Sequence, residues 1–338
     1  MNSAPLTLGI IGAANIARQF TAAVRDSDAV KVMAVASRTT ETARAFAESC
    51  GVEKHYASYE ALLDDDSIAA VYIPLPNHLH AEWAIKAAER RKHVLCEKPL
   101  CMGRAEAMRM FAAARSKGVM LLEAYPYKFQ PQTLELLRLL NEGAIGTVRT
   151  MQASFGFTVM NPEVNIRMKP EVGGGALLDA GSYPLSLIRM VMGEVPRSVS
   201  ASPVWADTGV DISMMATMEF SNQRLAQLSC AMNVANHRRA VIMGTQGTIE
   251  TEYINHPSVA VPSQLRIRRG IANTIAFEDI PAPIGSGFLF EAEAFAAMVR
   301  RGDTEEFERS AAFSTDIATT LEAIAKSART GELVTLAN

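Results

Sequence analysis

The alternation of apolar and polar residues divides the chain into two parts with different rhythms. Up to about residue 125, short apolar runs rich in β-branched residues alternate with segments of helical periodicity. The predicted strands are 6–11, 30–37, 69–73, 93–97 and 119–124, and the predicted helices between them are 15–25, 40–50, 78–91 and 104–117. Nearly continuous apolar strands that alternate with helices form parallel sheets covered on both faces. The first part therefore predicts an α/β domain with a Rossmann parallel sheet.

Beyond residue 126, strand-like runs follow one another with few helices between them. A helix is predicted at 131–141, and the strand-like runs are 148–157, 197–206, 213–221, 224–233 and 239–253. Asn222 and Gln223 separate two of these runs as a hairpin turn. Two helices, near 288–301 and 310–329, close the chain. Consecutive strands pair antiparallel, so we expect an α+β domain around an open, mainly antiparallel sheet.

A chain of 338 residues exceeds what one hydrophobic core usually supports. We therefore expect two domains, a dinucleotide-binding domain at 1–125 and an α+β domain at 126–338 that binds substrate. A long open sheet leaves one face to cover, and self-association is a common way to cover it. The second domain thus predicts a homodimer or homotetramer formed through its sheet.

Composition and charge narrow the possible partners and the compartment. The net charge of -3 offers no electrostatic reason to expect nucleic acid or an acidic membrane surface. No apolar run approaches the ~20 residues of a membrane span, and the N-terminus lacks the basic region of a signal peptide. The four cysteines show no C-x-x-C spacing and are expected to be free thiols. These features predict a cytoplasmic protein.

A degenerate dinucleotide fingerprint follows the first predicted strand. G-x-G-x-x-G/A fits Gly12-Ala13-Ala14-Asn15-Ile16-Ala17, with alanine at its second and third positions. Gly12 permits the tight turn, and the small residue at 14 lets the backbone approach a pyrophosphate at the helix N-terminus. A plain strand-to-helix turn with small residues is the alternative. The position, after a first strand and at the start of a run of βα units, favours dinucleotide binding.

The end of the second strand indicates which dinucleotide is bound. NAD-selective sites usually carry an acidic residue there, whereas this strand ends in Ser37-Arg38. An arginine can pair with a 2′-phosphate as a planar fork, and serine can donate a hydrogen bond to it. We therefore expect NADP, with NAD as the alternative if Arg38 is only a solvated surface residue.

Two further stretches carry chemistry. In HVLCEKPL, residues 93–100, a buried strand ends in Glu97-Lys98-Pro99, and ligands of parallel sheets bind beyond such strand ends. Proline stops the strand, so Lys98 can point into the crevice; a Glu97–Lys98 salt bridge is the structural alternative. In GGGALLDAGSYP, residues 173–184, Asp179 and Tyr183 lie one helical turn apart. A helix-capping aspartate and a core tyrosine are the alternatives here.

These stretches, together with IPLPNHLH at 73–80, resemble the Gfo/Idh/MocA oxidoreductase family in their order and over nearly the whole chain. Tyr183 stands where most members carry histidine, as in the branch with NADP-dependent D-xylose dehydrogenases and dimeric trans-1,2-dihydrobenzene-1,2-diol dehydrogenases. That resemblance implies Tyr183 as the proton carrier, Lys98 as its partner and an unusual, often cis, Lys98-Pro99 peptide. Asp179 would orient the lysine or accept a substrate hydroxyl.

The resemblance also implies an activity and the remaining site residues. The expected reaction is NADP-dependent hydride transfer at a carbinol carbon of a sugar or cyclic polyol; the alternatives are a keto-sugar reductase and a non-catalytic nucleotide-sensing regulator. Leu75, Asn77, His80 and Glu97 are expected on the cofactor side, and Tyr125, Tyr127 and Arg167 on the substrate side. No metal is expected, because His78-x-His80 lacks a third ligand.

Overall fold

The computed structural model describes residues 4–336, and these form two compact units. Within the described residues, the first unit contains 4–126 and 286–315, and the second contains 127–285 and 316–336. The first boundary falls close to residue 125, where the rhythm of the sequence changes. Residues 286–315, however, belong to the first unit, whereas a single division at residue 125 assigns them to the second.

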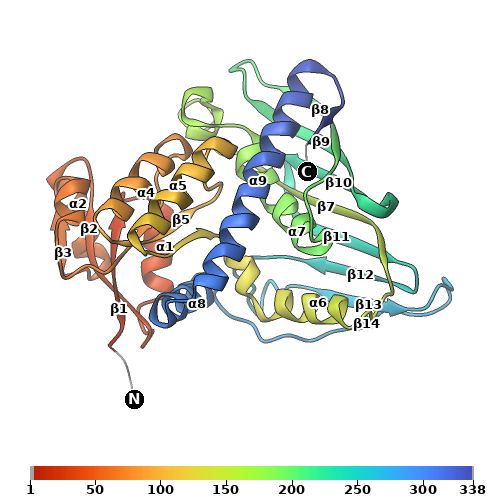
Figure 1. The fold of residues 1–338 in the computed structure, drawn as a ribbon, viewed down its shortest axis with the longest axis horizontal. Helices are drawn as coiled ribbons and strands as arrows, with labels where there is room; N and C mark the ends of the chain where they lie inside the picture. Colours follow the sequence, from red (N-terminus) through yellow and green to blue (C-terminus); the bar gives the residue numbers. More distant parts are fainter. Residues whose placement is uncertain (1–3, 337–338) are drawn as a thin grey trace. The chain divides into compact units, whose positions relative to one another are not determined.

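The first unit is built on a six-stranded parallel sheet with strand order β3-β2-β1-β4-β5-β6 (Figure 1). Its strands are β1 (Leu6–Ile11), β2 (Val30–Ala36), β3 (Lys54–Tyr56), β4 (Ala70–Ile73), β5 (His93–Glu97) and β6 (Leu121–Ala124). Its helices before the boundary are α1 (Asn15–Ala23), α2 (Thr40–Cys50), α3 (Tyr59–Leu63), η1 (Asn77–Leu79), α4 (His80–Glu89), α5 (Arg104–Lys117) and the start of η2 (Pro126–Phe129). The predicted Rossmann sheet is confirmed, and the short elements β3 and α3 are additions that the sequence pattern did not reveal.

Helix α8 (Gly287–Arg301) joins the first unit from far along the chain, next to α1 (Figure 1). The Phe20 and Phe288 rings pack edge to face, with centroids 5.8 Å apart. The Ser27 hydroxyl donates to Glu293 over 2.9 Å, and Arg300 donates to the carbonyl of Ala29 over 2.7 Å. Burial of an apolar helix face against α1 is therefore what assigns this segment to the first unit.

The second unit carries a nine-stranded sheet with order β14-β13-β12-β11-β7-β10-β9-β8-β15. The strands are β7 (Val148–Thr158), β8 (Ser198–Trp205), β9 (Asp211–Glu219), β10 (Leu225–Ala231), β11 (Asn233–Gly244), β12 (Gly247–Glu252), β13 (Leu265–Arg269), β14 (Glu278–Asp279) and β15 (Val334–Thr335). Among the strands described for this sheet, only β7 and β10 pair in parallel, so the prediction of an open, mainly antiparallel sheet is confirmed.

The helical segments of the second unit are few. They are the remainder of η2, α6 (Pro131–Asn141), η3 (Ile166–Met168), η4 (Pro170–Val172), the π-helical η5 (Leu177–Gly181), α7 (Ser182–Met192), η6 (Ser221–Gln223) and the later part of α9 (Thr304–Thr330). The boundary between the units falls within α9, which starts earlier than the helix predicted near 310–329.

Turns fix the strand boundaries in the second sheet. Asn222 and Gln223 have φ of 55° and 60° and close the predicted hairpin between β9 and β10. The predicted single run 239–253 is instead a hairpin, because the chain reverses at Thr245-Gln246 and Gly244 pairs with Gly247. The two glycines that flank Thr245-Gln246 are the turn signal that the single-run prediction passed over.

One face of the second sheet packs on helix α7 and the other stays open. In β7, Met151, Ala153 and Phe155 are buried, whereas Gln152 between them is exposed. On the open face, Met215 of β9 is 65% exposed, and a shallow hollow of about 340 Å³ extends across β7, β9, β10 and β11. The period-2 alternation of apolar and polar residues is that of a sheet with one covered face.

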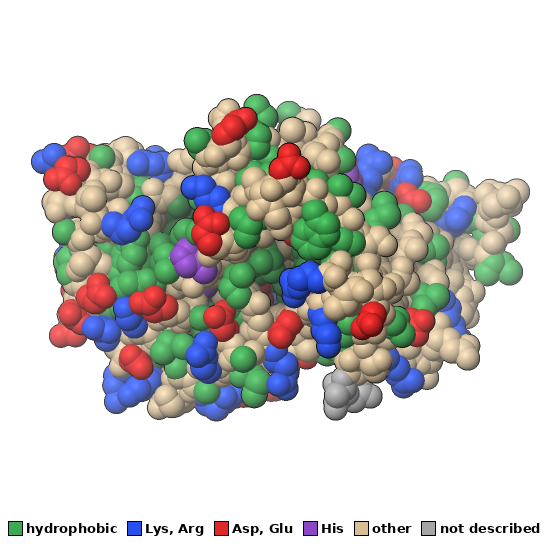
Figure 2. Space-filling view, turned by 90° about the horizontal axis from the view of Figure 1, so that it is seen from above, with side chains coloured by type: hydrophobic (Ala, Val, Ile, Leu, Met, Phe, Trp, Pro, Cys, Tyr) green, Lys and Arg blue, Asp and Glu red, His purple; other side chains and the backbone are tan. Residues whose placement is uncertain are grey.

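The face of the molecule shown in Figure 2 carries side chains of both charges. Acidic and basic side chains intermingle over the face shown in Figure 2, in agreement with the net charge of -3. Among residues 4–336, no helix is both long enough and apolar enough to cross a membrane. Within the same residues, no cluster of three His, Cys, Asp or Glu side chains is arranged to hold a metal ion.

Candidate active site

The turn between β1 and α1 has the geometry of a phosphate-binding loop. Gly12 follows β1 with φ +110°, and a Cβ at this position would lie 2.7 Å from Cδ2 of Leu75. Ala14 is the N-cap residue of α1 with extended backbone, and its methyl group offers no hydrogen bond to the first turn. The first N–H groups of a helix have no intrahelical acceptor. Small side chains and these donors together suit a pyrophosphate.

The end of β2 carries the two residues expected to select the dinucleotide. Ser37 is buried, and its N–H donates to the carbonyl of Tyr56 over 3.2 Å. Arg38 is exposed, and its charge acts on Tyr59, whose pKa is raised by burial and lowered in part by the arginine. The guanidinium therefore lies at the strand end with its head accessible to a ligand, which suits a 2′-phosphate.

Buried carboxylates fix the segment that follows β5. The Tyr72 hydroxyl donates to one oxygen of Glu97 over 2.6 Å, and the Lys98 N–H donates to the other over 3.2 Å. Glu123 accepts from the N–H of Leu100 over 2.8 Å. The Lys98-Pro99 peptide is cis, as the family resemblance implied. Glu97 is buried and Lys98 is half-buried, so the carboxylate serves the backbone while the lysine reaches the surface.

His80 lies beneath this segment rather than on its surface. The side chain is fully buried, with Nδ1 2.9 Å from the carbonyl oxygen of Pro99 and Nε2 2.7 Å from that of Leu75. Burial lowers its pKa, against the raising effect of the two carbonyls. His80 therefore ties the loop after β4 to the loop after β5, a backbone role in place of the expected contact with cofactor. Asn77, at the start of η1, is half-buried.

The glycine-rich turn before η5 is held by an aspartate that sequence reasoning missed. Asp211 accepts from the N–H of Leu177 over 2.6 Å, and a Cβ at Gly175 would overlap its carboxylate. Gly175 also has φ +113°. Burial raises the pKa of Asp211 to about 6, against the lowering effect of the backbone N–H groups. Asp211 begins β9 and carries no sequence signal of its own, so only its three-dimensional position reveals this role.

Asp179 on η5 forms an ion pair with Arg167, whose Nε lies 2.6 Å from the carboxylate. The pair is partly open, because the side chains are 41% exposed for Arg167 and 17% for Asp179. The carboxylate is the main cause of the raised pKa of Arg167. Two residues predicted independently for the substrate side are thus brought together.

Tyr183 is the second residue of α7 and is almost buried, with 5% of its surface exposed. Asn255 donates from Nδ2 to the phenol oxygen over 3.0 Å. The guanidinium carbon of Arg238 lies 4.2 Å from the centroid of the phenol ring. Arg238 and Asn255 come from β11 and from the loop after β12, and no motif marks them in the sequence.

The two tyrosines expected on the substrate side are fully buried. The Tyr127 hydroxyl is 2.6 Å from the Ser186 hydroxyl, and its ring lies 5.9 Å from that of Tyr183. Tyr127 therefore supports the wall behind Tyr183. Tyr125, at the end of the first unit, likewise has no exposed surface to offer a substrate.

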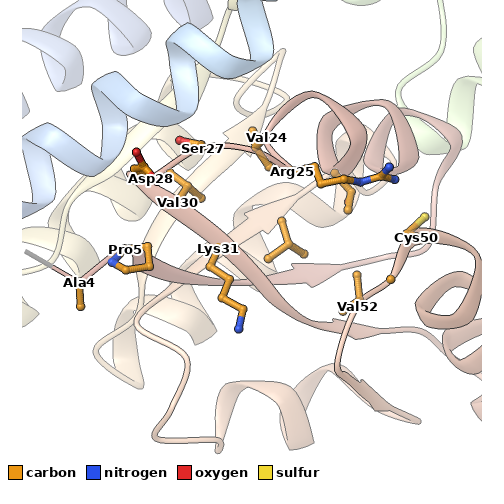
Figure 3. Close-up of a pocket in the computed structure, with 13 residues that line it drawn as sticks. Ala4, Pro5, Val24, Arg25, Ser27, Asp28, Val30, Lys31, Cys50 and Val52 are labelled. Carbon is orange, nitrogen blue, oxygen red and sulfur yellow. The ribbon is translucent and has the colours of Figure 1, made fainter. Parts of the chain in front are cut away.

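A cavity of about 460 Å³ in the first unit lies at the opposite end of the strands (Figure 3). Pro5 precedes β1 and Val30 begins β2, while Val24 and Cys50 come from the ends of α1 and α2. Ligands of parallel sheets bind at the carboxyl ends of strands, so this cavity is separate from the loops at Gly12 and Lys98.

The chain matches known families along both parts. Residues 6–125 match the oxidoreductase family with an NAD-binding Rossmann fold, and residues 133–250 match the Gfo/Idh/MocA C-terminal domain. The chain belongs to the Gfo/Idh/MocA oxidoreductase family. The resemblance drawn from the four sequence motifs is thereby confirmed, and so is the expectation of an oxidoreductase.

Relatives of similar length refine this picture. The chain is 33% identical to D-xylose 1-dehydrogenase (NADP(+)) 2 of Haloferax volcanii, over 98% of this chain and 100% of the relative. It is 35% identical to trans-1,2-dihydrobenzene-1,2-diol dehydrogenase of Danio rerio, over 91% of this chain and 92% of the relative. Among solved structures, a 3-ketoreductase from Actinomadura kijaniata in complex with NADP and TDP-benzene superimposes with a TM-score of 0.86. The two chains are 32% identical, and the match covers 96% of this chain and 98% of the ketoreductase.

Proposed function

We propose that this protein is an NADP-dependent oxidoreductase that interconverts a carbinol of a sugar or cyclic polyol with its carbonyl, in the manner of an aldose 1-dehydrogenase. Relatives that match over more than nine-tenths of their length are an NADP+-dependent D-xylose 1-dehydrogenase and a trans-1,2-dihydrobenzene-1,2-diol dehydrogenase. The observation that carries the proposal is the placement of Asp179 and Tyr183 on the consecutive helical segments η5 and α7, where Arg167 pairs with Asp179 and Asn255 donates to Tyr183.

The cofactor would be held by the loops of the first unit. We assign the pyrophosphate to the turn Gly12-Ala13-Ala14-Asn15-Ile16, where the positive φ of Gly12 and the small side chains leave room for it. Ser37 and Arg38 would bind the 2′-phosphate. Leu75 and Asn77, on the loop after β4, would lie on the nicotinamide side, with Glu97 and His80 fixing the backbone beneath. When bound, NADP supplies the hydride acceptor or donor for the carbinol carbon.

The proton is assigned to Tyr183. Its phenolate accepts the hydroxyl proton in oxidation, and its phenol returns a proton in reduction. Because the phenol oxygen already accepts a hydrogen bond from Asn255, its own proton is directed to another acceptor. Lys98 is proposed as the ammonium that favours the phenolate during turnover, since the ordinary pKa of tyrosine, about 10, is poorly matched to neutral pH.

Asp179 and Arg167 are proposed to bind the substrate hydroxyl groups. A carboxylate accepts hydrogen bonds and a guanidinium donates them, so the pair can bind neighbouring hydroxyls of a polyol. Both side chains keep some exposed surface, unlike Tyr125 and Tyr127. Their ion pair holds the carboxylate and the guanidinium side by side.

Reduction of a keto sugar is the second candidate. A 3-ketoreductase with 32% identity shares the fold over nearly the whole chain, and the same tyrosine would then act as proton donor. The two candidates differ in the direction of the reaction and in the substrate, not in the residues that handle the proton.

We further propose a cytoplasmic homodimer or homotetramer formed through the second sheet. The four cysteines are free, which suits a reducing compartment. The open face of the sheet exposes Met215 and a shallow hollow over four central strands, and a second copy would cover it.

Reduction of NADP+, with NAD+ in parallel, across a panel of aldoses, inositols and cyclic diols tests the proposal. We expect turnover of at least one sugar with NADP+ and a loss of about 10²-fold or more in kcat for Tyr183→Phe, which keeps the ring but removes the proton carrier. Tyr127→Phe is the matched control, because it removes a buried hydroxyl from the ring next to Tyr183.

The outcomes separate the two candidates. If no alcohol of the panel reduces NADP+ but keto sugars oxidise NADPH, the reductase is favoured. Full activity of Tyr183→Phe would contradict the assigned proton carrier. A preference for NAD+ would show that Arg38 is a solvated surface residue.

A further inference from the structure

Arg238 is placed on the inner face of the second sheet by the alternation of β11. Ala240 and Ile242 of the same strand are buried, whereas Arg239 points to the open face and pairs with Glu252 over 3.2 Å. Arg238 faces Phe155 across the pair β7–β11, and its guanidinium carbon lies 3.9 Å from the Phe155 centroid. A charged side chain on an apolar inner face is uncommon and calls for a specific partner.

Tyr183 is that partner. The guanidinium lies 4.2 Å from the centroid of its ring, and the Phe155 ring meets the Tyr183 ring edge to face at 5.4 Å. The polar partners of Arg238 are the Asn255 side-chain oxygen at 3.0 Å and the Tyr253 carbonyl at 3.5 Å. Among the described residues these contacts include no carboxylate, so the positive charge remains directed at the aromatic pair.

The same guanidinium fixes the orientation of the Asn255 amide. A guanidinium only donates hydrogen bonds, so the atom of Asn255 that faces it must be the carbonyl oxygen. The NH₂ group is then turned towards Tyr183, where it donates to the phenol oxygen over 3.0 Å. The backbone of Asn255 is held in turn by Gln130, whose Nε2 donates to its carbonyl over 2.6 Å.

Both contacts favour the ionised phenol. A nearby cation attracts the negative charge of a phenolate, and a hydrogen bond donated to the phenolate oxygen stabilises it further. On the basis of the role proposed above for Tyr183, we infer that Arg238 and Asn255 are positioning residues that stabilise the Tyr183 phenolate and direct the phenol proton towards substrate.

Other charged or titratable groups lie around Tyr183 and Arg238. Arg167, which pairs with Asp179, and Tyr127 lie near Tyr183, whereas Tyr253 and His256 lie near Arg238. The His256 pKa falls to about 4 through burial and, to a smaller extent, the charge of Arg238. His256 is therefore neutral near pH 7, and Arg167 is already paired with Asp179. Arg238 is the cation stacked on the ring.

Ultraviolet titration of tyrosinate tests this directly and needs neither substrate nor cofactor. The contribution of Tyr183 is obtained by subtracting the titration curve of Tyr183→Phe from that of the unmodified protein. Because burial of the phenol acts against the cation, the informative quantity is the change of this midpoint between variants and not its absolute value. Arg238→Met, measured against its own Tyr183→Phe double variant, should raise the midpoint by about one pH unit or more. Asn255→Leu should raise it as well, and Arg238→Lys should restore part of the shift.

Arg239→Met is the matched control, because it removes the neighbouring arginine from the open face of the same strand. Its midpoint should equal that of the unmodified protein. If Arg238→Met does not fold, as judged by circular dichroism, Arg238→Gln replaces it. A midpoint in folded Arg238→Gln equal to that of the unmodified protein overturns the inference as well.

The possible failures are distinguishable. An unchanged midpoint in folded Arg238→Met overturns the role of Arg238 even if the enzyme oxidises sugars and depends on Tyr183. If Arg238→Met shifts the midpoint but the protein turns over no sugar or keto sugar, the proposed reaction is overturned. The inference that Arg238 stabilises the Tyr183 phenolate then still holds. Where activity is found, the acid limb of the kcat/KM–pH profile, which reports the free enzyme, should move in the same direction as the titration.

Discussion

At the scale of single residues, buried polar side chains fix the backbone of the candidate site through hydrogen bonds. Glu97, Glu123 and His80 bind backbone groups around the Lys98-Pro99 segment. Asp211 does the same for the turn before η5. Because a buried polar group without a hydrogen bond costs about 1–3 kcal/mol, each of these residues constrains the backbone that it serves.

Asp211 gives the stability of the protein a specific pH dependence. Its folded-state pKa of about 6 lies above its usual range, so the folded state holds the proton more tightly than the unfolded chain. The stabilisation that this proton provides is complete below about pH 4 and is lost as the pH rises through about 6; it amounts to about 3 kcal/mol. Asp211→Asn cannot titrate but retains an acceptor for the Leu177 N–H.

Urea unfolding of both proteins at several pH values measures this effect. The free energy of unfolding of the unmodified protein, taken relative to Asp211→Asn, should fall by about 2–3 kcal/mol between about pH 4 and pH 7. A difference that stays constant over this range would mean that the carboxyl is ionised throughout.

At the scale of elements, the β1–α1 turn depends on a backbone that only glycine adopts easily. Gly12 combines φ +110° with a neighbour, Leu75 Cδ2, at 2.7 Å from an added Cβ. Gly51, which caps α2 with φ +70°, has no atom within 4 Å of such a Cβ. The two positions therefore separate backbone strain from steric overlap.

Gly12→Ala should lower the free energy of unfolding by about 2–3 kcal/mol, and Gly51→Ala by about 1 kcal/mol. Gly12→Ala should also weaken NADPH binding about 10-fold or more, whereas Gly51→Ala should leave it unchanged, because only the first turn is assigned to the pyrophosphate. Thermal unfolding and fluorescence titration with NADPH give the two readouts. Equal NADPH affinity in both variants would remove the turn from the proposed cofactor site.

At the scale of the whole molecule, the open face of the second sheet is the feature to be explained. It carries Met215 at 65% exposure beside polar side chains such as Gln152 and Gln227. A broad sheet face of this mixed character suits a second copy of the chain, because the apolar part can be buried while the polar part forms hydrogen bonds.

Met215→Arg should convert the proposed dimer or tetramer to smaller species, because it places a charge without a partner in the interface. Val259→Arg is the control, since Val259 is 90% exposed in a loop outside the sheet. Light scattering after size-exclusion chromatography gives the mass of each variant. A monomeric unmodified protein, or an oligomer that survives Met215→Arg, would contradict assembly through this face.

The amino-acid sequence alone determined the elements with strong local patterns. Continuous apolar strands between helices predicted the Rossmann sheet, and the Asn222-Gln223 turn predicted the hairpin between β9 and β10. The motifs at Gly12, Lys98, Asp179 and Tyr183 were also readable, because chemistry that depends on residues close in sequence leaves a fixed spacing.

Only the tertiary structure decided which distant residues complete the site. Arg238, Asn255 and Asp211 reach Tyr183 and the glycine-rich turn from other elements. Burial of Tyr127 and His80 moved them from ligand contact to support. Packing of α8 on α1 placed residues 286–315 in the first unit. Contacts between residues far apart in the chain follow from how apolar faces are buried together, and no local pattern encodes them.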